Sequence, residues 1–216
     1  LSGLKVLPRL ESLSLTCMMQ PPAVVQTSAT TLQDPGFLDG IPTSLTGLAI
    51  MSVVECPWQT WFERNLPRLA NLRHCIAGGS FESAATASYA FLNTLPPGLK
   101  TLSIPVGEGL FLTDDQQNCF KRLPRTLESL ELHASYTLRR PLEFTDAHFD
   151  SLPLSLTHLQ INASSRTLTP ALLDVLPPRC YRLHLTQAAN ELQAALTQFH
   201  FRPQWETYSP MVAYFR

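Results

Sequence analysis

Three histidines are the side chains of this 216-residue chain whose spacing could support metal binding or proton transfer. His133, His158 and His184 fall in three successive copies of a repeated phrase, and clustered imidazoles bind metals or exchange protons near neutral pH. Within their copies, however, they occupy three different positions, so they do not form one ladder. We therefore interpret them as surface histidines with a partner-contact role, and we predict neither a catalytic site nor a metal site.

The acidic residues suggest local structural roles. Asp115 and Asp146 each follow a threonine, closely or directly, where a helix is expected to begin, and a carboxylate stabilises the positive end of a helix. The chain contains no glycine-rich phosphate loop, no GxSxG elbow, no HExxH pair and no CxxC pair. The sequence predicts no enzyme, no cofactor and no small-molecule substrate.

The amino-acid composition limits the classes of binding partner. The net charge is -1 and no run of Lys or Arg occurs, which argues against a protein that binds nucleic acid or a membrane surface. No apolar stretch approaches the roughly 20 residues that span a bilayer. The five cysteines are scattered singly, which is typical of buried free thiols in a reducing compartment, so we expect a cytoplasmic location.

The elements that carry these side chains follow from a repeat, in a chain with 37 leucines. The phrase Leu-Pro-x-x-Leu-x-x-Leu-x-Leu returns about seven times, with Ile, Thr or Cys at some positions. Its first core positions, 24 to 35 residues apart, are Leu10, Leu45, Leu69, Leu99, Leu127, Leu156 and Cys180. Seven copies at this period predict a solenoid in which each unit packs on its neighbours.

Each copy predicts one short strand with an apolar face. In the sixth copy, Leu159 and Ile161 share one face and His158 and Gln160 share the other. The expected strands are 13–15, 48–50, 72–74, 102–104, 130–132, 159–161 and 183–185, with His74 in place of a strand leucine. Short helices are expected over 116–122, 147–151 and 171–175, each ended by the next Leu-Pro step.

The inner phrase Leu-x-x-Leu-x-Leu resembles the leucine-rich repeat, in an irregular subfamily, over nearly the whole chain. The resemblance implies an α/β solenoid, a curved horseshoe with a parallel sheet on its concave side and short helices on its convex side. Many such repeats carry an Asn shortly after the strand, which this chain lacks. We expect Ser, Thr or water to satisfy the backbone groups of that corner.

Both ends of the chain depart from the repeat. Residues 1–187 are predicted to form the solenoid, and residues 188–216 a C-terminal capping helix with an aromatic-rich tail. Leu1 already lies inside a repeat, so we expect a fragment of a longer protein whose first core residues are uncovered. Trp58, Trp61 and Phe62 have helical spacing, which predicts a buried face.

The sequence favours a non-enzymatic protein-interaction module that binds a protein partner on the concave face. The candidate partner-binding residues are Arg73, Glu131, His158, Gln160, Arg182 and His184. Two alternatives stay open: a structural subunit of a large assembly, and the substrate-recruiting part of a ubiquitin ligase, a role that the resemblance implies for some members.

Overall fold

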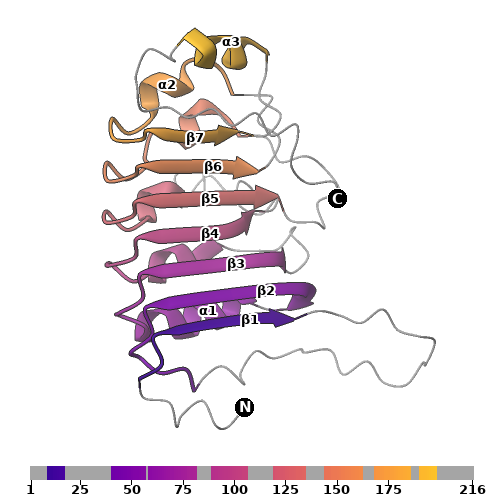
Figure 1. Ribbon diagram of the computed structural model, residues 1–216, viewed down its shortest axis with the longest axis vertical. Helices are drawn as coiled ribbons and strands as arrows, with labels where there is room; N and C mark the ends of the chain where they lie inside the picture. The colour runs from indigo at the N-terminus through magenta and orange to yellow at the C-terminus, as the bar shows by residue number, and fades with distance from the viewer. Residues whose placement is uncertain are drawn as a thin grey trace, which may run out of the picture.

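Seven parallel strands form a single sheet in sequence order (Figure 1). The computed structural model describes residues 9–17, 40–56, 58–81, 89–106, 119–134, 144–162, 168–185 and 190–198. The strands are β1 (Ser12–Cys17), β2 (Gly47–Cys56), β3 (His74–Phe81), β4 (Thr101–Val106), β5 (Ser129–Ala134), β6 (His158–Asn162) and β7 (Arg182–Leu185). Each strand pairs in parallel with the next, as expected when every repeat contributes one strand.

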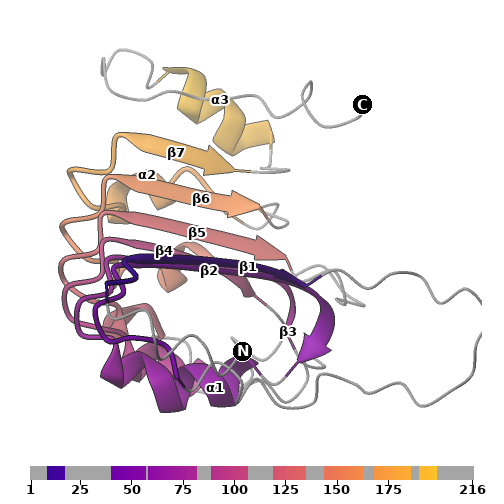
Figure 2. The ribbon, with the colours of Figure 1, turned by 60° about the horizontal axis from the view of Figure 1, so that its bottom comes forward.

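Short helical segments form a second layer behind the sheet (Figure 2). They are α1 (Trp58–Asn65), η3 (Leu66–Arg68), η4 (Tyr89–Thr94), η7 (Cys119–Arg122), η8 (Asp146–His148) and α2 (Leu172–Val175), whereas α3 (Asn190–Gln198) lies at the end of the stack. The segments labelled η are 3-10 helices; η7 lies within the short helix expected over 116–122, and η8 overlaps the one expected over 147–151. The following Leu-Pro step leaves room for little more than one turn.

The core lies between the two layers. Leu130, Leu159 and Leu183 are paired across β5, β6 and β7 and are nearly inaccessible to solvent, which confirms the expected column. Trp61 and Phe62 of α1 are also buried, as predicted, whereas the side chain of Trp58 lies outside the described residues. Together with the parallel sheet, this arrangement is the α/β leucine-rich-repeat solenoid that the sequence predicts.

A ladder of backbone hydrogen bonds joins the repeats just before each strand. The Glu128 carbonyl accepts from the N–H groups of Thr157 and His158, at 2.8 and 3.0 Å, and the same pattern recurs along the stack. Ser155 adds its hydroxyl, which lies 2.6 Å from the Leu127 oxygen. Thr126 donates in the same way to Leu99. Ser and Thr hydroxyl groups therefore satisfy backbone oxygens at the corner before each of these strands. The corner at which many leucine-rich repeats carry an Asn is a different one, because it lies after the strand.

The third repeat corrects the predicted register. His74 pairs with Gly47 and Thr101, and the buried Cys75 continues the core column of leucines. The strand therefore begins at His74, so the prediction of a strand over 72–74 was wrong. His74 points outward, and Cys75 takes the position of the missing leucine. Leu72 lies six residues after Leu66, whereas Leu99 lies four after Leu95, so this connection is two residues longer and Leu72 replaces Leu69 as the first core position.

The described C-terminal segment is α3, which lies beyond β7 at the end of the stack (Figure 1). Its Leu192 is fully buried. The division into a solenoid and a capping segment stays a prediction, since residues 1–8 and 199–216 lie outside the described ranges. Among the residues that the structure describes, no helix is long and apolar enough to span a bilayer.

Candidate functional site

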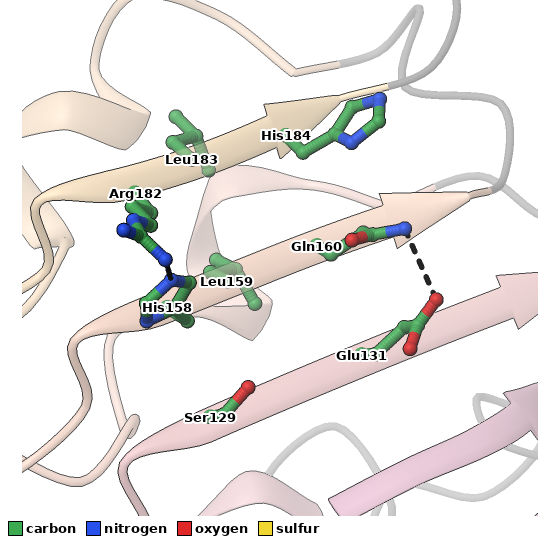
Figure 3. Close-up of a pocket in the computed structure, with 8 residues that line it drawn as sticks. All are labelled: Ser129, Glu131, His158, Leu159, Gln160, Arg182, Leu183 and His184. Carbon is green, nitrogen blue, oxygen red and sulfur yellow. Dashed lines mark hydrogen bonds between the residues drawn. The ribbon is translucent and has the colours of Figure 1, made fainter. Parts of the chain in front are cut away.

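A hollow of about 320 Å³ lies on the sheet face over β5, β6 and β7 (Figure 3). Its lining residues are Ser129, Glu131, His158, Leu159, Gln160, Arg182, Leu183 and His184. The structure thus brings together five of the six residues that the sequence predicted as partner contacts. Arg73 is the exception, because it precedes β3 and its exposed guanidinium lies over Gly98 of the next repeat.

Strand register places the polar lining side chains in two rows. Side chains alternate between the two faces of a strand, so residues two apart share a face. One row contains Ser129, paired with His158, and then Arg182. The second row, two residues further along each strand, contains Glu131, Gln160 and His184. The hollow therefore combines side chains of adjacent strands that are 29 or 24 residues apart in the chain.

Glu131 is the most strongly bound side chain of the hollow. Its carboxylate accepts hydrogen bonds from Ser103 Oγ at 2.9 Å, from Gln160 Nε2 at 3.0 Å and from Asn162 Nδ2 at 3.1 Å. The His133 imidazole, whose Nδ1 lies 3.8 Å from Oε1, is the main cause of a lowered Glu131 pKa, and partial burial opposes it. Glu131 therefore links β4, β5 and β6 through its own carboxylate.

Arg182 is positioned by a chain of hydrogen bonds. Its Nη1 donates to His158 Nε2 at 2.7 Å. Since a guanidinium only donates, this bond requires an unprotonated Nε2 and places the imidazole proton on Nδ1. That nitrogen lies 3.3 Å from Thr157 Oγ1, whose hydroxyl donates in turn to the Glu128 carbonyl at 2.9 Å. The chain runs from β7 across β6 to the backbone beside β5.

Tyr181 completes this cluster and was missed by the sequence reasoning. Its ring packs edge-on against His158 with 5.4 Å between centroids, and the Arg182 guanidinium carbon lies 5.7 Å from its centroid. Tyr181 as a whole residue remains 36% exposed. Because Tyr181 precedes β7, strand alternation did not place it on the sheet face. An aromatic residue directly before an outward Arg was the available signal.

The charge of Arg182 is not neutralised within the described part of the molecule. No carboxylate among the residues described here lies within 4.0 Å of its guanidinium, and the side chain is exposed. His184 lies beside it, and its Nε2 is buried without a hydrogen-bond partner in the same set of residues. The β7 side of the hollow therefore presents an unpaired cation, whereas the β5 side contains a carboxylate that is already bound.

An apolar patch lies at the other half of the sheet face. Met51 and Ile76, on β2 and β3, are 44% and 39% exposed. The Met51 thioether lies over Gly78, where a β-carbon would overlap it. Ala49 pairs with Ile76 and extends the patch. The sequence reasoning missed Ile76 because of the register error in the third repeat, and Met51 because the second strand was expected to end at residue 50.

Asp146 and His133, which were weighed as metal ligands, have structural partners. Asp146 accepts hydrogen bonds from Thr169, from its N–H at 3.1 Å and its hydroxyl at 2.6 Å, and so connects two repeats. His133 Nε2 lies 3.1 Å from the Ala77 oxygen, away from His158 and His184. Within the described ranges, no group of three or more His, Cys, Asp or Glu residues could hold a metal ion. Asp115 lies outside those ranges.

The parallel sheet with one strand per repeat and the helical layer behind it define a leucine-rich-repeat type of solenoid. The chain is similar to one solved structure of that class, the leucine-rich repeat-containing protein LegL7 from Legionella pneumophila, at 18% sequence identity and a TM-score of 0.38. The match covers 75% of this chain and 45% of LegL7, so the chain spans less than half of that protein. No family model matches the sequence, and no curated protein matches it.

Proposed function

We propose that the chain is a non-enzymatic protein-interaction module that binds a protein partner on the concave face of its sheet. The observation that carries this proposal is the exposed Tyr181–Arg182 pair at the edge of the hollow. Tyr and Arg are the residue types that most often dominate binding energy at protein interfaces. Solenoids of this kind also offer an extended concave surface, which suits a protein partner.

Preorganisation of the pair supports the same proposal. Arg182 is held by the His158 ring and the Tyr181 ring, so less side-chain entropy is lost when a partner binds it.

Buried thiols at Cys75 and Cys180 support a reducing, cytoplasmic setting for this function, because free cysteines persist there.

The test compares two matched arginine variants of the full chain. Arg182→Ala removes the exposed cation of the concave face, and Arg122→Ala removes an exposed cation of η7 in the helical layer. Quantitative affinity purification from lysate should lose the main partners with Arg182→Ala and retain them with Arg122→Ala. Retention with the first variant together with loss with the second would contradict concave-face binding.

A permanent structural subunit is the second candidate, and an exposed leucine favours it. Leu154 lies in the turn before β6 and is 70% exposed, away from the sheet face. A second interface would cover such a residue. One stoichiometric complex that is lost with Leu154→Ser would support the subunit. Several substoichiometric partners would support a recruiter, including the recruiter of a ubiquitin ligase.

A further inference from the structure

We propose that the concave face binds an extended segment of its partner through two anchors, an acidic side chain at Arg182 and an apolar side chain on the Met51–Ile76 patch. The Met51–Ile76 patch consists of Ala49, Met51 and Ile76. This inference rests on the proposed function and specifies the chemistry of the partner.

The acidic anchor follows from the unpaired cation. A guanidinium has five N–H donors in a planar fork, and the His158 ring uses one of them in the structure. The remaining donors of Arg182 suit a carboxylate, which accepts two parallel hydrogen bonds from such a fork. The His158 and Tyr181 rings hold the guanidinium at the rim of the hollow, where it is exposed to an approaching partner.

Glu131 does not prevent an acidic side chain from binding at Arg182. Three hydrogen bonds and the nearby His133 ring already stabilise its negative charge. Arg182 and Glu131 lie on strands two spacings apart, or about 9.6 Å. That separation exceeds the Debye length of about 8 Å at physiological ionic strength, so the repulsion on an incoming carboxylate is largely screened.

The apolar anchor follows from the exposed side chains of β2 and β3. Met51 is unbranched and lies flat over Gly78, and such a side chain adapts its shape to an apolar partner. Ile76 provides a fixed β-branched surface diagonally across the sheet from it. Ser103 of β4, which is hydrogen-bonded to Glu131 in the hollow, lies between this patch and the hollow, so one partner side chain cannot contact both anchors.

Strand spacing sets the separation of the two anchors in the partner. Ile76 is on β3 and Arg182 is on β7, four strand spacings apart, or about 19 Å. An extended chain advances about 3.3 Å per residue, so it covers this distance in about six residues. The partner segment therefore crosses the strands with its acidic and apolar residues about six positions apart.

The experiment is a selection from a displayed library of random sixteen-residue peptides, embedded between linkers so that every carboxylate belongs to a side chain. The 216-residue chain is the target. We expect enriched peptides to contain Asp or Glu about six positions from Leu, Ile, Met or Phe. Failure to enrich this pair, or its enrichment at the roughly thirteen-residue spacing of a helix, overturns the inference.

Matched variants then assign each anchor by fluorescence anisotropy with the best enriched peptide. Arg182→Gln should weaken binding roughly tenfold or more, and Arg122→Gln should leave it within about twofold. Ile76→Thr should weaken binding, and Leu154→Thr, at a side chain that is exposed outside the sheet face, should not. Replacing the peptide's acidic residue by its amide tests the same anchor without altering the protein, and an unchanged affinity there overturns the inference.

The two proposals can fail separately. Enrichment of acidic peptides that bind Arg182→Gln as tightly as the parent protein overturns the two-anchor inference. If Arg182→Ala nevertheless removes partners from lysate, concave-face binding stands while the acidic–apolar segment is rejected. A partner that presents a free C-terminal carboxylate, found by repeating the selection with unblocked C-termini, would likewise overturn the side-chain anchor.

Discussion

Truncation of Leu159 to alanine is the sharpest test of the packing described here. Leu159 is 1% exposed and lies in the middle of the column formed with Leu130 and Leu183. Neighbours on both sides are held by the sheet, so they cannot move together to fill the space. The change therefore removes apolar contacts and leaves most of a cavity behind.

The expected cost follows from those two contributions. Loss of three buried carbon atoms at about 0.8 kcal/mol each gives about 2.4 kcal/mol. A residual cavity adds about 24 cal/mol per Å³, or roughly 1 kcal/mol for a cavity of about 50 Å³. We therefore expect Leu159→Ala to lower the free energy of unfolding by about 3 to 4 kcal/mol.

Urea denaturation followed by circular dichroism measures this free energy, and hydrogen exchange of β5, β6 and β7 shows whether the loss is local. Leu154→Ala is the matched control, because it makes the same change five residues away at a side chain that is 70% exposed. It should shift stability by no more than about 0.5 kcal/mol. Equal effects of the two variants would refute the assigned core column.

Three further predictions concern single side chains. The pKa of Glu131 in the folded protein is below its ordinary 4.5. The ionised carboxylate therefore stabilises the fold above pH 4.5, and this contribution is lost as the pH falls through the lowered pKa. The free energy of unfolding should depend less on pH below 4.5 in Glu131→Gln than in the parent protein. Burial raises the pKa of the Cys75 and Cys180 thiols to about 12. Both should therefore resist alkylation by iodoacetamide at pH 8 until urea is added, as measured by site-resolved mass spectrometry. Rapid alkylation of the native protein would contradict this burial. Ser155→Ala removes the hydroxyl that reaches two carbonyls of the preceding repeat and should cost about 1 kcal/mol in urea denaturation, whereas Ser151→Ala removes only a local bond and should cost less; equal costs would argue against the hydroxyl ladder.

The third repeat shows where sequence reasoning reached its limit. The Leu-Pro phrase predicted Leu69 as the first core position, and the structure places Leu72 there. Both leucines are buried, but the predicted register put His74 at a core position, whereas the observed one puts Cys75 and Ala77 there. The length of a turn is decided by how η3 packs on the stack, which a pattern of residue types does not encode. This error moved Arg73 onto the sheet face and hid Ile76.

Most of the polar residues that line the hollow could be predicted from the sequence. Strand alternation places His158, Gln160, Arg182 and His184 outward because their neighbours Leu159, Ile161 and Leu183 must be buried. The repeat then places these residues on adjacent strands. Their grouping on one face is therefore a consequence of periodicity alone.

The sequence by itself determined the repeat, the parallel order of its strands and the face on which each strand residue lies, because hydrophobic burial acts on a fixed period of two within a repeated unit. Only the tertiary structure decided which polar groups bind one another. It pairs Glu131 with Ser103 of one neighbouring strand and Gln160 of the other, and it leaves Arg182 beside His158 and Tyr181 without a described carboxylate. Hydrogen bonds and ring contacts depend on rotamers and ångström-scale distances, which only packing in three dimensions sets.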